Sequence, residues 1–336
     1  MFLLALVVGC ASVGWWGWGR IMGPATVFEE ERRELLVPTG ADLEMVIDSL
    51  KAIGALDDDK IFRWLCERKN YALRIRPGRY VIERGTGLNA LVDRLRSGQQ
   101  DPVRVTFTNI ADLPELAGRL ARTLEPDSAA FLNGLQDPVA QEEAGMAPTT
   151  FIALFIPNTY EFWWTTTPSQ FIDRMRKEHD AFWTSDRRTK ARELELSAVE
   201  VSTLASIVQA ETVQMADAAR IAGVYLNRLR IGMPLQADPT LKFALRLGHV
   251  QRVLDRDKDV ASPYNTYKYA GLPPGPINMP EPRFIDAVLD AEPHAFLYFC
   301  ARSDLSGFSD FSRTYEQHLV NARKYQRALN QRKIFR

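Results

Sequence analysis

The chain has 336 residues, of which 46% are hydrophobic and 25% are charged. This composition is ordinary for a globular protein, and the length suits two domains or one large domain with a buried core. Lys and Arg together number 42, as do Asp and Glu, so the net charge is zero and no basic excess argues for a nucleic-acid partner.

An uncharged run opens the chain, because residues 2–18 read FLLALVVGCASVGWWGW. A membrane-spanning helix needs about 20 apolar residues, and tryptophans favour the membrane–water interface. We therefore expect residues 1–23 to form a membrane anchor. A cleaved signal peptide and a lipoprotein signal at Cys10 are the alternatives. Each of the three would place the rest of the chain outside the cytoplasm.

Residues 27–100 have the pattern of a small α/β unit. Apolar periodicity, acidic residues before helices and glycines after them predict a strand, two helices, a short strand and a last helix. In that order they cover residues 27–37, 43–54, 57–66, 80–82 and 88–98. A boundary near residue 100 would separate this unit from a larger second domain, residues 101–336.

The second domain is predicted to mix strands and helices, so the expected fold class is α+β. Alternation and helical periodicity predict its elements, with a loose connection over 136–150 and a final helix beginning at Phe311. The other elements are a strand at 103–107, two helices within 111–135, helices over 168–184 and 186–196, a helix over 282–290 and a strand over 296–300.

A helix beginning after Ser197 carries the first candidate for chemistry. Ser197 and Glu200 form a capping box, and an apolar face follows at helical spacing until Glu211 continues it. Burying a carboxylate costs several kcal/mol, and the C-terminal end of a helix also disfavours negative charge. Both effects raise a carboxyl pKa and would suit Glu211 to general acid catalysis. The alternative is an ordinary exposed Glu211 at a frayed helix end.

Two aspartates downstream have structural explanations. Asp217 is placed to cap a helix that Gly232 ends, and Asp238 precedes a proline as a helix N-cap would. Residues 262–280 then form a long loop rich in Pro, Gly, Asn and Tyr. A loop of this length is usually functional or disordered, and its tyrosines argue for order.

Several chemistries find no support in the sequence. There is no Walker loop, dinucleotide-binding fingerprint, GxSxG or HExxH motif, and the four histidines are scattered. We therefore expect neither a cofactor nor a metal. Cys66 and Cys300 are expected to be buried free thiols, although the sequence leaves a disulfide between them open.

Four segments resemble the signature of the YceG-like endolytic murein transglycosylases, the MltG family. They are LASIVQAET, IAGVYLNRLRIGMPLQADPTLKFAL, SPYNTYKYAGLPPGPINMP and LYFCA, which begin at residues 204, 221, 262 and 297. The resemblance implies that Glu211 is the catalytic acid and that residues 27–100 are a LysM-like subdomain in contact with glycan. It implies substrate binding for Asn227, Gln236, Asp238, Tyr264, Asn265, Tyr267 and Asn278, and a structural role for His318. Gln209 stands where many members carry another Glu.

The function implied by this resemblance is endolytic cleavage of the β-1,4 bond between N-acetylmuramic acid and N-acetylglucosamine in nascent peptidoglycan strands. The products would carry 1,6-anhydromuramyl ends, and cleavage would help to end glycan elongation. The implied partners are glycan strands and the cell-wall synthesis machinery, with the protein anchored once in the bacterial cytoplasmic membrane and its catalytic domain outside. A lysozyme-type muramidase using Asp238 or Asp217 as second carboxylate is one alternative. A non-catalytic peptidoglycan-binding scaffold is the other.

Overall fold

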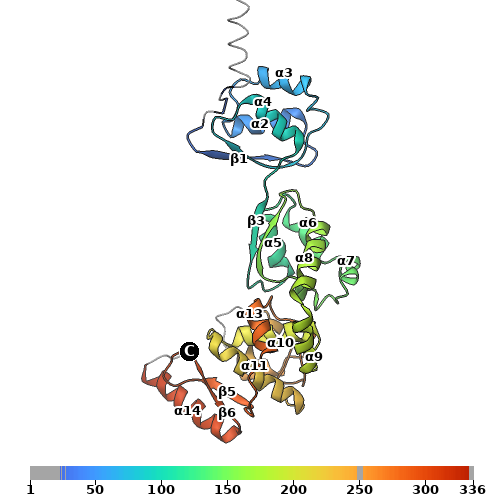
Figure 1. Cartoon of the computed structure of the whole chain (residues 1–336). Helices are drawn as coiled ribbons and strands as arrows, with labels where there is room; N and C mark the ends of the chain where they lie inside the picture. Colours follow the sequence, from blue (N-terminus) through green and yellow to red (C-terminus); the bar gives the residue numbers. More distant parts are fainter. Residues whose placement is uncertain (1–22, 24, 27, 248–252, 333–336) are drawn as a thin grey trace, which may run out of the picture. The chain divides into compact units, whose positions relative to one another are not determined.

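The computed structural model describes residues 23, 25, 26, 28–247 and 253–332 (Figure 1). The described chain has a mixed α+β fold that is mostly helical, with three two-stranded sheets, β1–β2, β3–β4 and β5–β6. None of the helices in this part of the chain is both long and apolar enough to span a membrane. The predicted anchor, residues 1–23, lies outside the described residues except for its last position.

The chain divides into two compact units. The first comprises the described residues up to Val105 together with 120–127 and 159–167. The second comprises residues 106–119 and 128–158 and the described residues from Pro168 onward. The predicted division at residue 100 into a LysM-like and a catalytic domain stays a prediction.

The N-terminal part of the first unit has the elements expected from its apolar pattern. They are β1 (Arg32–Val37), α2 (Leu43–Ala52), α3 (Lys60–Arg68), β2 (Gly78–Glu83) and α4 (Leu88–Ser97). Strands β1 and β2 pair antiparallel with Leu35 opposite Tyr80, and both side chains are fully buried. Helices α2 and α4 supply the other side of this core (Figure 1). Gly98 ends α4 at a positive φ of 72°, which glycine adopts without strain.

The remaining strands and α-helices follow the prediction with three corrections. Strand β4 (Asn158–Phe162), which pairs with β3, was not predicted. The supposedly loose segment 136–150 contains helix α7, which Asp137 caps by accepting a hydrogen bond from the Val139 amide. Strand β6 precedes the final helix, which begins at Tyr315 rather than at Phe311. The elements up to residue 211 are β3 (Val103–Phe107), α5 (Leu113–Ala121), α6 (Ser128–Leu135), α7 (Pro138–Glu143), η1 (Phe151–Leu154), β4 (Asn158–Phe162), α8 (Pro168–Phe182), α9 (Ser185–Glu193) and α10 (Ala198–Glu211). After them come α11 (Met215–Arg230), α12 (Asp238–Ala244), η2 (Asp255–Asp259), α13 (Pro282–Leu289), β5 (Tyr298–Ala301), β6 (Ser309–Ser312) and α14 (Tyr315–Gln331).

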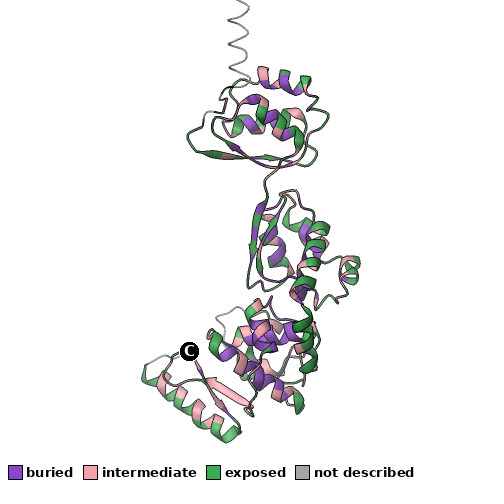
Figure 2. Ribbon diagram, in the orientation of Figure 1, coloured by how far each residue is buried: buried purple, intermediate pink, exposed green. Residues whose placement is uncertain are grey.

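Helix α10 lies at the centre of the second unit, in contact with α11, α12 and α13 (Figure 1). The predicted capping box is present, since Ser197 and Glu200 each bond to the other's backbone N–H. Leu204, Ile207 and Val208, which formed the predicted apolar face, are buried, and so is every other residue from Val201 to Val208. Figure 2 shows α10 in the colour of buried residues, whereas α14 has no buried residue. Helix α10 is therefore enclosed on all sides over residues 201–208, and its last residue is Glu211, which is half-buried.

Ser206 joins α10 to the long loop over residues 262–280. Its hydroxyl accepts a hydrogen bond from the Ile277 amide at 3.0 Å and donates to the Thr203 carbonyl at 2.7 Å. The Asn278 amide donates to the Ser206 carbonyl at 3.1 Å. Because Ser206 and Ile277 are both buried, water cannot replace these contacts.

We expect Ser206→Ala to lower the free energy of unfolding by about 1–3 kcal/mol, since it leaves the buried Ile277 N–H without an acceptor. Ser202→Ala is the matched control, because the Ser202 hydroxyl bonds only to the Ala198 carbonyl of its own helix. Urea titrations of the two variants would measure the difference. Equal losses would show that the contact with the loop contributes nothing of its own.

Candidate active site

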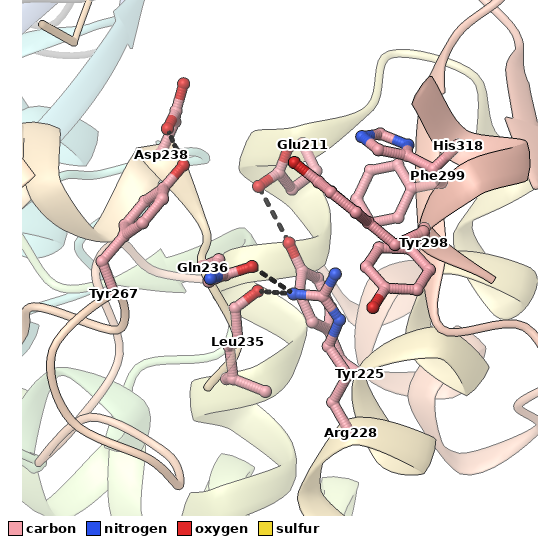
Figure 3. Close-up of a pocket in the computed structure, with 11 residues that line it drawn as sticks. Glu211, Tyr225, Arg228, Leu235, Gln236, Asp238, Tyr267, Tyr298, Phe299 and His318 are labelled. Carbon is pink, nitrogen blue, oxygen red and sulfur yellow. Dashed lines mark hydrogen bonds between the residues drawn. The ribbon is translucent and has the colours of Figure 1, made fainter. Parts of the chain in front are cut away.

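A cavity of about 290 Å³ opens at the C-terminal end of α10. Its volume is at the lower end of the range for small-ligand sites. Figure 3 shows Glu211 between two groups of side chains, Asp238 with Tyr267 on one side and Tyr298, Phe299 and His318 on the other. The lining residues are Glu211, Tyr225, Arg228, Leu235, Gln236, Asp238, Tyr267, Tyr298, Phe299, Tyr315 and His318.

Glu211 is held on one oxygen and open on the other. Its Oε1 accepts a hydrogen bond from the Tyr225 hydroxyl at 2.9 Å (Figure 3). Its Oε2 has no hydrogen-bond partner within the described part of the chain. Tyr225 is itself buried on α11, so the carboxyl group is fixed while one oxygen stays available to a ligand.

The surroundings of Glu211 raise its pKa from 4.5 to about 7. Burial is the main cause, since it disfavours the charged form, and the Asp238 carboxylate adds to it. The hydrogen bond from Tyr225 and the positive charges of Lys242 and Arg228 act in the opposite direction. Burial also raises the pKa of Tyr225 well above its usual value, so its hydroxyl stays protonated and remains a donor. The predicted perturbation of Glu211 is confirmed, and the exposed, ordinary alternative was wrong.

Arg228, on α11, lines the cavity and donates hydrogen bonds to two other segments of the cavity wall. Its Nε donates to the Leu297 carbonyl at 2.7 Å, and one terminal nitrogen donates to the Leu235 carbonyl at 2.7 Å. The guanidinium also lies 5.2 Å from the ring centre of Tyr298, within cation–π range. Arg228 thus ties the segment before α12 and the segment before β5 to one helix.

The segment before α12 is held in a strained backbone conformation. Gln236 has a φ of 55°, a region that residues other than glycine seldom adopt. Its amide donates to the Thr266 carbonyl at 3.0 Å, and the Ala237 amide donates to the Thr266 hydroxyl at 3.0 Å. These two bonds to the long loop keep Gln236 and the following residues at the cavity wall.

Asp238 is not the helix cap that its sequence context predicted. Ala237 occupies the N-cap position of α12, and Asp238 is the first residue of the helix. Its side chain instead accepts a hydrogen bond from the Tyr267 hydroxyl at 2.5 Å (Figure 3). The pair brings a carboxylate from α12 and a tyrosine from the long loop to the same cavity as Glu211.

Aromatic rings from β5 and α14 form the facing wall. The rings of Tyr298 and His318 are stacked, with centres 5.5 Å apart and an angle of 27° between their planes. Tyr315 contacts both of these rings, with its centre 6.1 Å from that of His318 and 5.7 Å from that of Tyr298, and 53% of Tyr315 is exposed. Burial and the charge of Arg228 lower the pKa of His318, which favours its neutral form. His318 therefore contributes to the cavity as well as to packing.

The structure brings four of the predicted site residues to the cavity, and four others lie outside its lining. Glu211, Gln236, Asp238 and Tyr267 are the four at the cavity. The others are Asn227, Tyr264, Asn265 and Asn278. The catalytic role predicted for Glu211 and the substrate-binding roles predicted for the other seven residues stay predictions.

The residues outside the lining have partners within the protein. Asn227 donates to the carbonyls of His294 and Phe296 at 2.8 and 3.0 Å. Asn265 is fully buried, donates to the Lys258 and Val260 carbonyls and accepts from the Tyr267 and Lys268 amides. The ring of Tyr264 packs on that of Phe243 at 4.7 Å, and Asn278 bonds to Ser206. Asn265 thereby shapes the loop that presents Tyr267.

Seven lining residues were not predicted as site residues. Tyr225 carries the clearest signal, because a tyrosine on a buried helix needs a partner for its hydroxyl. Arg228 carries another, since a charged residue between apolar helix positions needs compensation. The rest, Leu235, Tyr298, Phe299, Tyr315 and His318, come from segments that only the tertiary fold brings together.

The structure also bears on the predictions for Asp217, for the two cysteines and for a metal site. Asp217 does not cap α11; Gln214 holds that position, and the buried Asp217 carboxylate accepts a hydrogen bond from the Ser309 amide at 2.7 Å. Asp217 is also absent from the cavity lining. Cys66 and Cys300 are free thiols, as expected, although Cys300 is only half-buried. Among the described residues no cluster of His, Cys, Asp and Glu could hold a metal ion.

Comparisons with known proteins match most of this chain to one family. The model of the YceG-like family matches residues 35–324. An endolytic murein transglycosylase of Bacillus subtilis is 28% identical over 311 residues, which cover 88% of this chain and 85% of the relative. One from Streptococcus pneumoniae is 27% identical over 298 residues, but the match spans only 53% of its length. The crystal structure of a YceG-like protein from Listeria monocytogenes has a TM-score of 0.58 and 26% identity, with 86% of this chain and 98% of that chain covered.

The raised pKa of Glu211 predicts a pH-dependent cost of folding. Below pH 4.5 the folded and unfolded states both hold the proton, and the cost is absent. As pH rises to about 7, the unfolded chain loses the proton before the folded chain does, so stability falls by up to about 3 kcal/mol and then levels off. Glu211→Gln lacks this group, and its melting temperature should exceed that of wild type by up to about 6 °C at pH 8 but little at pH 4.5.

Differential scanning calorimetry between pH 4.5 and pH 8 would measure this difference. Glu193→Gln is the matched control, because Glu193 is exposed at the end of α9 in the same unit. It should show no comparable growth of the difference with pH. A constant offset for Glu211→Gln at all pH values would contradict the assigned burial cost.

Proposed function

We propose that this chain, which belongs to the YceG-like family, is a lytic transglycosylase that cuts peptidoglycan glycan strands internally. The observation that carries the proposal is the half-buried Glu211, whose pKa is raised to about 7 and whose carboxyl group has one oxygen open to a cavity. The relatives from Bacillus subtilis and Streptococcus pneumoniae are both named endolytic murein transglycosylase, which supports the substrate class.

A single carboxyl group suffices for the proposed reaction. Glu211, protonated on Oε2, gives its proton to the glycosidic oxygen that leaves C1 of the muramyl residue. The resulting carboxylate then takes the proton of the muramyl 6-hydroxyl as its oxygen bonds to C1. The bond from C1 to the leaving oxygen is replaced by a bond from C1 to O6, and no water is consumed. The products are a 1,6-anhydromuramyl end and a free hydroxyl on the next sugar.

The side chains around Glu211 favour both proton transfers of this reaction. A pKa near 7 leaves a large share of the acid form present while keeping the conjugate base strong enough to accept a proton. Tyr225 stays a donor and stabilises the carboxylate that forms when the proton leaves. The positive charge of Arg228 acts in the same direction.

A lysozyme-type muramidase is kept as the second candidate because Asp238 lines the same cavity. A retaining hydrolase uses a second carboxylate as nucleophile, and an inverting one uses it to activate water. Asp238 already accepts a hydrogen bond from Tyr267, which leaves its other oxygen for such a role. The two reactions differ by one water in the mass of the cleaved end.

The location and partners belong to the same proposal. We propose that residues 1–23 anchor the chain in the cytoplasmic membrane with the catalytic unit outside, where glycan strands are assembled. The LysM-like part would contact the same strands, and the cell-wall synthesis machinery would supply nascent ones. The uncharged segment 2–18 and the substrate class support this arrangement.

The full-length protein should release glycan ends that are lighter by one water from purified peptidoglycan, as read by mass spectrometry. We expect Glu211→Gln to lower the rate at least about a thousandfold, because both proton transfers are lost. Glu193→Gln, which removes an exposed carboxylate outside the cavity lining, should retain the wild-type rate. Ordinary reducing ends would favour the muramidase, and full activity of Glu211→Gln would refute the assignment of the acid.

Tyr225→Phe should shift the alkaline limb of the pH–rate profile upward by about one pH unit. The acid form of Glu211 is required, and the lost hydrogen bond had lowered the pKa of Glu211. Tyr298→Phe is the matched control, since Tyr298 lines the same cavity and makes no hydrogen bond to Glu211. A downward shift, or an equal shift in both variants, would contradict the role given to the Tyr225 hydroxyl.

A further inference from the structure

Tyr315, the first residue of α14, lines the cavity that holds Glu211 and is nevertheless largely open to solvent. Of this residue 53% is exposed, although its ring is large and mostly apolar. Its hydroxyl makes no hydrogen bond within the described residues. Exposed apolar surface beside a cavity is typical of a binding site, because a ligand that covers it removes apolar area from water.

The ring of Tyr315 is held in place by contacts within the protein. Its centre lies 5.7 Å from that of Tyr298 and 6.1 Å from that of His318. The start of α14 is fixed as well, because the Thr314 hydroxyl caps the helix by accepting a hydrogen bond from the Gln317 amide at 3.4 Å. A ligand that packs on the ring of Tyr315 therefore loses little affinity to ordering the protein.

The two sides of the cavity differ in chemistry. The side formed by β5 and α14 is aromatic, and the lowered pKa of His318, caused mainly by burial, keeps charge away from it. The opposite side carries the hydrogen-bonding groups of Gln236, Asp238 and Tyr267 (Figure 3). Each ring of a β-1,4-linked glycan has C–H groups on its faces and hydroxyl or amide groups around its edge. Such a ring can place a face on the aromatic side and direct its edge to the polar side.

The size of the cavity indicates where Tyr315 acts. About 290 Å³ is at the lower end of the range for small-ligand sites, whereas a strand that is cut internally continues on both sides of the bond. Sugars next to the cleaved bond must then extend past the cavity and contact its surroundings. Tyr315 belongs both to the lining and to the exposed surface, so its ring lies where a strand would leave the cavity.

We propose that Tyr315 is a substrate-binding residue whose ring stacks on the face of a sugar next to the bond that is cleaved. This role rests on the proposed function, since it concerns the same cavity and the same glycan. Both alternating sugars have C–H faces, so the contact is indifferent to the lactyl group and to an attached stem peptide. Tyr315 helps to hold the strand across Glu211 and takes no part in proton transfer.

Binding to the full-length Glu211→Gln protein tests this role without turnover. Isothermal titration calorimetry would use an uncrosslinked peptidoglycan octasaccharide that retains its stem peptides. Added to Glu211→Gln, Tyr315→Ala should weaken binding about tenfold, as the loss of an aromatic contact allows. Tyr315→Phe should bind as Glu211→Gln does, because stacking uses the ring and not the hydroxyl. Equal affinity for Tyr315→Ala, an equal loss in both variants, or no measurable binding of the octasaccharide would overturn the proposal.

A matched control separates contact with the glycan from packing within the protein. Tyr325→Ala removes the same side chain from a half-buried position of the same helix, outside the cavity lining, and should keep full affinity. The LysM-like part is the same in every variant, so its contribution to binding cancels. A loss of affinity that Tyr325→Ala shares would overturn the proposal. So would a drop in melting temperature for Tyr315→Ala that exceeds the drop for Tyr325→Ala, because packing would then explain the lost binding.

The outcome is separable from that of the proposed function. Anhydromuramyl products from wild type, together with full affinity of Tyr315→Ala, would leave the transglycosylase in place and refute the role of Tyr315. Binding that depends on the ring of Tyr315, together with ordinary reducing ends from wild type, would support the stacking and refute the reaction. The mass-spectrometric digest and the titration therefore test different statements.

Discussion

The site depends on holding the Glu211 carboxyl group at the end of a helix whose residues 201–208 are enclosed on all sides. Residues Val201–Val208 are buried, so α10 cannot turn Glu211 toward solvent without disrupting the core of the second unit. Burial disfavours the charged carboxylate and is the main reason why its pKa rises to about 7. The helix capping box and the packing of α11 and α13 on α10 together fix this placement of Glu211.

Much of the surrounding structure supports this placement rather than contacting the cavity. The strained backbone of Gln236 is held by Thr266, and the buried Asn265 folds the loop that presents Tyr267 to Asp238. Strain of this kind costs of order 1–3 kcal/mol and persists only where neighbouring bonds over-determine it. Four hydrogen bonds of the Asn265 side chain, all to backbone groups, provide such a constraint. A residue such as Asn265, for which substrate binding was predicted, can thus act indirectly by positioning the residues that line the cavity.

Local patterns predicted what local interactions determine. The capping box at Ser197, the helix ends at Gly98 and the position of Glu211 at the end of an apolar helix all depend on residues within a few positions of one another. The roles of Asp217 and Asp238 were missed because each is decided by a distant partner, the Ser309 amide and the Tyr267 hydroxyl. Strand β6 was missed for the same reason, since four residues become a strand only by pairing with β5. The aromatic wall required α14 and β5 to meet, which no spacing in the sequence indicates.

The opposing charges around Glu211 suggest how one carboxyl group can serve as both acid and base. Asp238 raises the pKa of Glu211, whereas Arg228 lowers it. Burial outweighs the positive charges of Lys242 and Arg228, so the protonated form of Glu211 is favoured before any proton is transferred. Once the proton has left, the hydrogen bond from Tyr225 remains to stabilise the carboxylate. The contact that lowers the pKa of Glu211 thus also keeps the charged form within reach.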